Sequence, residues 1–156
     1  MAMTITVPDI MTTLQNSAVK RVINAGIFDS EEIQRENTAA PDVLPYCSVT
    51  VIASGEWEGE SQTRKDKNVI VEFDVYTREM SNTQLARGLA YAIEREFGIK
   101  DAVKRTIALP GWNGVSATVA TFSRGAASTE SDRGFYRLPV ILYVNVTMCE
   151  DAEYSV

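Results

Sequence analysis

The chain has 156 residues, of which 45% are hydrophobic, and its 15 basic and 21 acidic residues give a net charge of −6. This length and composition predict a single globular domain over residues 1–156 and exclude disorder of the whole chain. No apolar run approaches the roughly 20 residues of a membrane span, and the N-terminus lacks the basic and apolar regions of a secretory signal. We therefore expect a protein that folds in the cytoplasm and has no membrane partner.

Two features of the composition limit the function. The chain has no histidine, so the commonest general base is missing and serine–histidine or cysteine–histidine nucleophile pairs are impossible. Its acidic balance, without a basic stripe, argues against a protein that grips nucleic acid, although an acidic surface lets a duplex slide past. No glycine loop has the spacing of a phosphate cradle. We expect no enzyme and no cofactor, but a protein that binds and assembles with other proteins.

The first predicted elements are a helix at about 9–25 and a strand at about 46–53. Apolar residues recur at helical spacing in the first segment, and Asp9 and Gly26 suit its two ends. Residues 27–45 are rich in turn formers and predict an ordered loop with a short turn of helix.

A second strand is predicted at about 69–77, after a long loop at 54–68. Its alternation is regular, which is typical of an antiparallel sheet with one face in the core and the other on water or a neighbouring subunit. The residues expected to point to the core are Val69, Val71, Phe73 and Val75. Those expected to point away are Glu72, Asp74 and Tyr76.

The second half of the chain predicts a helix at 82–97, a short strand at 106–109, a strand at 115–123, a loop at 124–134 and a strand at 135–148. Ser81 suits the start of the helix and Gly98 its end. Pro139 cannot donate a ladder hydrogen bond, so it indicates a sheet edge or a bulge. The acidic tail after 148 is expected to be loose, and Cys47 and Cys149 are both expected to be small buried hydrophobes.

The element order is therefore α-β-β-α-β-β. Two hairpins predict an antiparallel sheet of about four main strands, and the two amphipathic helices predict a layer on one of its faces. This is an α+β fold.

The acidic residues of the long loop are a candidate site. Glu56, Glu58 and Glu60 alternate, so on an extended segment they could bind a hard cation or supply an acid–base pair. Basic residues follow directly in the same glycine-containing loop, which favours a solvated, self-neutralising segment. Trp57, in the same loop, is a candidate anchor for a partner, whereas Trp112 could contact a partner or plug the end of the core.

One segment carries a more specific pattern, VIVEFDVYTREMSNTQLARGLAYAIEREF at 69–97. An alternating strand ends in an aromatic residue, Thr77 and Arg78, and a short polar turn leads into an alanine-rich amphipathic helix. This resembles the tail-terminator, or tail-completion, family of long-tailed bacteriophages, and the element order of the rest of the chain agrees in outline.

The resemblance implies a homo-oligomeric, most simply hexameric, ring in the tail or neck of a virion assembled in the host cytoplasm. Such a ring caps the tail-tube protein, stops its polymerisation and docks a head-completion protein of the neck, while DNA passes through without specific binding. Lumen-facing acidic residues would be Glu72 and Asp74. Candidate contacts to a partner or neighbouring subunit are Trp57, Arg64, Lys65, Lys67, Arg124 and Arg133. The alternatives are another head-closure or connector protein, a non-viral α+β protein-binding module, or a small carboxylate enzyme.

Overall fold

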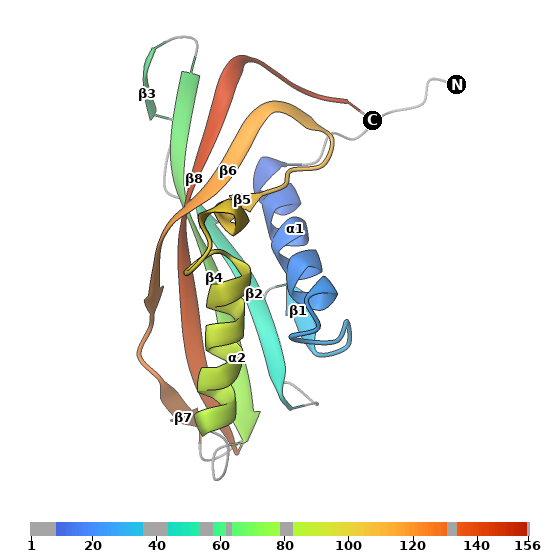
Figure 1. Cartoon of the computed structure of the whole chain (residues 1–156), viewed down its shortest axis with the longest axis vertical. Coiled ribbons are helices and arrows are strands. Elements are labelled where there is room, and N and C mark those ends of the chain that lie inside the picture. Colours follow the sequence, from blue (N-terminus) through green and yellow to red (C-terminus); the bar gives the residue numbers. More distant parts are fainter. Residues whose placement is uncertain are drawn as a thin grey trace, which may run out of the picture.

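The computed structural model describes residues 9–35, 44–53, 58–61, 64–78, 83–130 and 134–155. For residues 58–61, 64 and 130 it describes the backbone and not the side chains. These parts of the chain form two α-helices, one 3-10 helix and one curled sheet of eight strands (Figure 1). The elements are α1 (Ile10–Asn24), β1 (Ile33–Arg35), β2 (Tyr46–Ala53), β3 (Glu58–Ser61), β4 (Arg64–Arg78), α2 (Thr83–Glu96), η1 (Ala102–Arg105), β5 (Thr106–Ile107), β6 (Trp112–Arg124), β7 (Ser128–Glu130) and β8 (Phe135–Tyr154).

The strands run β1-β2-β4-β8-β6-β5 across the sheet, with β3 added to β4 and β7 added to β8. Every pairing is antiparallel except that of β1 with β2. The α+β class and the two predicted hairpins are confirmed, since β2 pairs with β4 and β6 with β8. The expected number of about four strands is too low, because short strands also form at the edges, in segments whose turn residues hide them.

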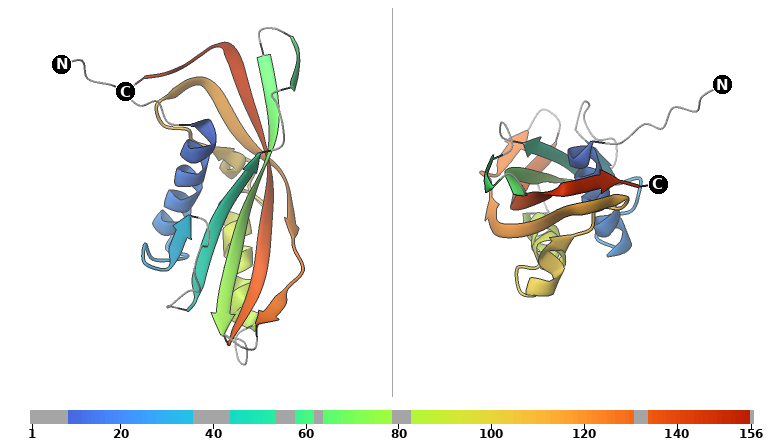
Figure 2. Two further views of the ribbon diagram at one scale, coloured as in Figure 1. Left: turned by 180° about the vertical axis from the view of Figure 1, so that it is seen from behind. Right: turned by 90° about the horizontal axis from the view of Figure 1, so that it is seen from above.

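Both α-helices pack on the same face of the sheet, as predicted (Figure 2). Asp9 caps the start of α1, where its carboxylate accepts a hydrogen bond from the backbone N–H of Met11 at 3.0 Å. The helix ends at Gly26, which has a φ of +74°. The N–H of Gly26 donates to the carbonyl of Ile23 and that of Ile27 to Val22, so the last turn closes as a Schellman motif. Gly98 ends α2 with the same pair of bonds.

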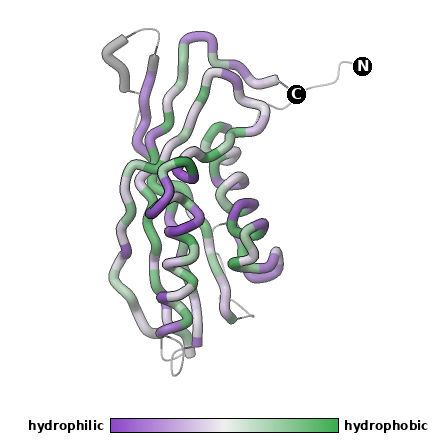
Figure 3. The backbone as a smooth tube through the Cα atoms, viewed as in Figure 1, coloured by the Kyte–Doolittle hydropathy of each residue, from purple (hydrophilic) through white to green (hydrophobic). Residues whose placement is uncertain are grey.

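The core lies between the helices and the sheet. The four residues of β4 predicted to face it are all buried, and the rings of Phe73 and Phe97 are 5.4 Å apart where α2 crosses the sheet. Leu14 on α1 and Ile93 on α2 are fully buried opposite them. Figure 3 shows hydrophobic stretches where strands lie under helices, and a hydrophilic run at the start of β4 that extends beyond the helices.

The two long central strands extend further than their sequences indicate. β4 and β8 stay paired from Arg64↔Cys149 to Arg78↔Phe135. Residues 64–68, expected in a loop, are therefore strand, because β8 offers them a ladder although their side chains are polar. The expectation of a loose tail is also wrong, because β8 continues to Tyr154. The ring of Tyr154 packs edge-on against that of Trp112, and the two ring centroids are 5.5 Å apart.

Some of the other expectations are confirmed and some are wrong. Cys47 is buried as predicted, but Cys149 is exposed, because it lies in the part of β8 that no helix covers. The loop at 124–134 contains β7, and the segment at 27–45 contains β1 where a turn of helix was expected. Ser81 lies outside the described residues. Pro139 lies on the central strand β8 and pairs with Asp74 without a register shift, so the expected sheet edge or bulge is wrong. It falls in the gap between the β6 and β7 ladders, where a missing N–H breaks no ladder bond.

Candidate interface on the helix-free face of the sheet

The face of the sheet that points away from the helices is built by alternate residues of β2, β4 and β8. Figure 2 shows these three strands uncovered when the molecule is seen from behind. Because side chains alternate along a strand, the residues of β4 next to the buried core positions all project to this side. Along it, an apolar hollow is followed by a cluster of charged side chains and then by an aromatic cluster.

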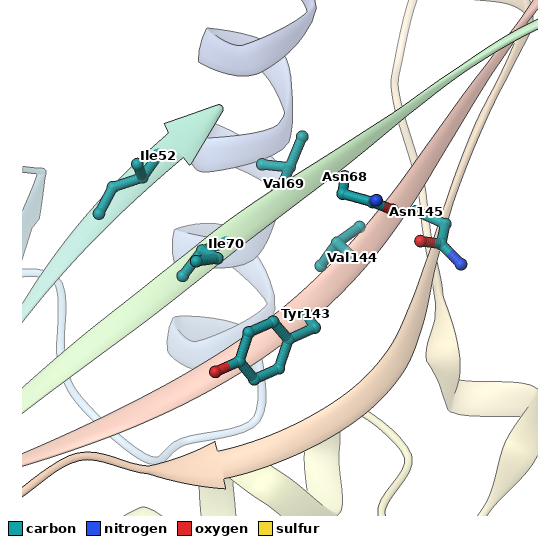
Figure 4. A pocket seen from close by; sticks show the side chains of 7 residues that line it. All are labelled: Ile52, Asn68, Val69, Ile70, Tyr143, Val144 and Asn145. Atoms are coloured by element: carbon teal, nitrogen blue, oxygen red, sulfur yellow. The ribbon is translucent and has the colours of Figure 1, made fainter. Parts of the chain in front are cut away.

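The hollow lies across the middle of the three strands. Ile52 is paired with Ile70, and Ile70 with Tyr143, so the three side chains form a row across the sheet (Figure 4). They line a depression of about 240 Å³ together with Asn68 and Asn145. Ile52 is 51% exposed and Tyr143 is 39% exposed. Ile52 and Tyr143 thus expose apolar side chains close to each other on this face of the sheet.

The charged cluster lies next to the hollow on β4 and β8. Nη2 of Arg137 is 3.0 Å from Oδ1 of Asp74 and 3.5 Å from Oε2 of Glu72. Burial, together with the charge of Asp74 and a hydrogen bond to it, raises the pKa of Glu72, and Arg137 only partly offsets this. One guanidinium thus serves two carboxylates.

An aromatic cluster closes the end of this face beyond the charges. Tyr46, Tyr76 and Phe135 are buried, and the rings of Tyr76 and Phe135 meet edge-on at 5.4 Å. Asp74 is only 7% exposed beside them. The expectation that Asp74 and Tyr76 lie on a wet face is therefore wrong, although both do point away from the helices. The buried hydroxyl of Ser48 has no hydrogen-bond partner among the described residues.

Among the predicted contact residues whose side chains the structure describes, Arg124 lies far from Lys65 and Lys67 along the sheet. Arg124 is bound by a buried carboxylate on α2, where its Nη2 lies 2.6 Å from Oε1 of Glu94, so it holds the fold together. Lys65 is exposed and Lys67 is half-buried on β4, on the opposite side of the strand from the hollow. The backbone of Arg64 begins β4. Trp57 and Arg133 lie outside the described residues.

The remaining candidates give no site. Trp112 is half-buried against the core and fills its end, one of the two roles considered for it. Glu56 lies outside the described residues, and Glu58 and Glu60 belong to β3, whose side chains are left aside. Within the described ranges no group of three or more His, Cys, Asp or Glu side chains could hold a metal ion. Nor is any helix in those ranges long and apolar enough to cross a membrane.

Sequence reasoning missed the apolar hollow, although a signal for it exists. Ile70 and Tyr143 stand at positions where the alternation of their strands calls for polar residues. An apolar residue out of phase with a regular strand pattern indicates a second buried or contacted face. The sequence does not show that these two residues lie beside each other and beside Ile52 of β2, because this depends on the register of the strands.

Comparisons with known proteins inform the fold alone. No family model and no curated protein matches the chain. Among solved structures, 32 chains match it. One of these, known by a sequence code that describes no function, superposes with a TM-score of 0.58 at 14% sequence identity, and the match covers 86% of this chain and 94% of that one. At this identity the likeness establishes a shared fold over most of both chains.

Proposed function

We propose that this protein is a structural assembly protein that closes into a homo-oligomeric ring and acts as a phage tail terminator. In this role the ring sits on the last turn of the tail tube, ends its polymerisation and presents a surface for the neck proteins of the head. The observation that carries the proposal is the uncovered apolar hollow formed by Ile52, Ile70 and Tyr143 on the helix-free face, which is suited to contact with protein.

The shape of the sheet supports an assembly role. β4, β6 and β8 extend beyond the helices as a long curled arm (Figure 1), and the arm offers backbone and side chains to a neighbour without exposing the core. A ring needs a contact between two different patches of adjacent subunits. The hollow provides one such patch, and a different surface of the neighbouring subunit would provide the other, whereas a monomeric binding module needs only one.

The acidic residues fit this role differently from what the sequence suggested. Asp74 is buried and Glu72 is half-buried, and both are paired with Arg137. In the proposed ring they therefore border the contact surface more readily than they line an open channel. Passage of DNA through the ring remains a proposal that rests on the resemblance to tail terminators.

A tube-capping assay tests the function. Purified protein is added to tail-tube subunits of its own phage during polymerisation, and tube lengths are measured by electron microscopy. We expect short tubes with a ring at one end. Ile52→Ser should lose capping, whereas Leu85→Ser, which changes another exposed apolar residue on α2, should retain it. Tubes of unchanged length with the unmodified protein would contradict the terminator proposal and favour another neck role or a general binding module.

A further inference from the structure

A second exposed apolar group lies on the opposite side of the molecule. Val103 on η1 is 84% exposed, the most exposed of the large hydrophobic side chains in the described part of the chain. Lys100 and Lys104 flank it, with Asp101 between them in the sequence, and Oε2 of Glu96 lies 4.0 Å from Nζ of Lys104. An isolated valine on a solvated turn needs no explanation by itself. Here, however, Val103 lies on a turn, residues 100–105, that also carries basic side chains, and we call this turn the projection.

The projection is held rigidly. Arg21 on α1 donates to the carbonyl oxygen of Lys104 at 2.9 Å, and Arg105 donates to that of Gly98 at 3.0 Å. The N–H of Val103 donates to the carboxylate of Asp101 at 3.1 Å. Because three bonds fix the turn in advance, little conformational entropy would be lost when Val103 enters a neighbouring surface.

The hollow on the other face carries the complementary charge. Along β4 it is bracketed by Asp66 on one side and by Glu72 and Asp74 on the other. From Asp66 to Tyr76, the described side chains on this face of β4 and their partners on β2 and β8 include these three carboxylates and one guanidinium, that of Arg137. An acid-bordered apolar hollow and a base-bordered apolar projection are matched both in polarity and in charge.

We propose that Val103 of one copy inserts into the hollow lined by Ile52, Ile70 and Tyr143 of the next copy. The two surfaces lie on opposite faces of the subunit, since η1 packs on the helix side and the hollow opens on the helix-free side (Figures 1 and 4). Such a contact is heterologous, and it forms a ring when the rotation from one copy to the next closes. Two hollows placed face to face would instead bring like charges together. This inference rests on the proposed ring and names its contact.

Disulfide trapping tests the contact directly. The exposed Cys149 is first replaced by Ser, and Cys47 is left in place because it is fully buried and burial raises the pKa of its thiol. A tagged copy carrying Val103→Cys is then mixed with an untagged copy carrying Ile52→Cys at the highest soluble concentration, and the mixture is oxidised. Tagged Lys20→Cys, on the exposed side of α1, replaces Val103→Cys in the control mixture.

We expect a disulfide between tagged and untagged copies in the first mixture and none in the control. Val103→Ser should also weaken self-association by roughly ten- to a hundredfold, the effect of losing one buried aliphatic side chain. A ring by light scattering without the mixed disulfide, or a disulfide only between two Val103→Cys copies, would overturn this contact and leave the ring proposal standing. A monomer without any disulfide, also after addition of tail-tube protein, would contradict both.

Discussion

The ion pair between Glu94 on α2 and Arg124 on β6 offers a test of what holds the helix layer to the sheet. Glu94 is 5% exposed, and its two oxygens accept from Nη2 of Arg124 at 2.6 Å and from Nε at 3.2 Å. Parallel bonds of this kind are stronger than a single contact. Replacing Arg124 by Met keeps most of the apolar stem and leaves the carboxylate of Glu94 buried without its partner.

The cost follows from the burial of the two groups. Breaking a fully buried pair from one side costs about 3–5 kcal/mol. The side chain of Arg124 is 35% exposed, so water can reach the freed carboxylate. We therefore expect Arg124→Met to lower the free energy of unfolding by about 2–3 kcal/mol, a sizeable part of the ~5–15 kcal/mol of a typical domain. Urea denaturation would show this as a lower midpoint at an unchanged slope.

The double variant separates the cost of leaving a buried charge without its partner from the cost of lost packing. Arg124→Met combined with Glu94→Leu removes both charges, and it should recover most of the lost stability. A single variant within about 0.5 kcal/mol of the unmodified protein, the range of ordinary surface changes, would refute this reasoning. So would a normal stability combined with lost self-association, because Arg124 would then act at a partner as the sequence suggested.

Three further predictions concern the fold and the charged cluster. Arg21→Met removes donors to three backbone carbonyls and the ion pair to Glu96, so urea denaturation should show a loss of about 2–4 kcal/mol; a loss below 0.5 kcal/mol would contradict the bonding. Because the pKa of Glu72 is raised in the folded state, the unfolded protein releases its proton first, and stability falls as pH rises from the unfolded pKa through the folded one. Glu72→Gln removes the charge that Asp74 repels, so this variant should be more stable than the unmodified protein at pH 7, and its stability should fall less as pH rises. Equal dependence of stability on pH in urea denaturation across pH 4–7 would argue against this reasoning. Gly98→Ala places a Cβ 2.5 Å from a side-chain carbon at a φ of +97°, so thermal unfolding should show a loss of stability of about 2–4 kcal/mol. Gly26→Ala is the control, because an added Cβ there meets nothing within 4 Å, and its loss should be clearly smaller.

The helices and the central strands could be predicted because local chemistry decides them. Asp9 can accept a bond at a helix start, and Gly26 and Gly98 tolerate the left-handed turn that ends a helix. Regular alternation on β4 placed its core face correctly. These signals lie within a few residues of the elements that they define.

The remaining parts of the fold depend on partners distant in the sequence. The short β1 exists because β2 runs parallel beside it, and the last residues of β8 are strand because β6 pairs with them. Asp74 and Tyr76 have the polar pattern of a wet face, yet both are buried, Tyr76 among aromatic residues of β2 and β8 and Asp74 beside Arg137. No local propensity encodes such burial, because it arises when residues 46, 76 and 135 meet.

The candidate site was the least predictable part. The sequence drew attention to basic residues and tryptophans, of which Arg124 and Trp112 serve the fold. The hollow consists of ordinary apolar residues that matter only because the register of three strands aligns them on the uncovered face. Strand phase can flag such residues one at a time, but their assembly into one surface requires the sheet.

The most direct test of the assembly account is the solution mass of the purified protein, measured by light scattering across a concentration series. The account predicts a closed ring, most simply a hexamer of the 17.2 kDa chain, whose population rises with concentration. Ile52→Ser should shift the equilibrium toward the monomer while the protein stays folded. A strict monomer at every concentration, unchanged by addition of tail-tube protein, would contradict the ring and with it the proposed function.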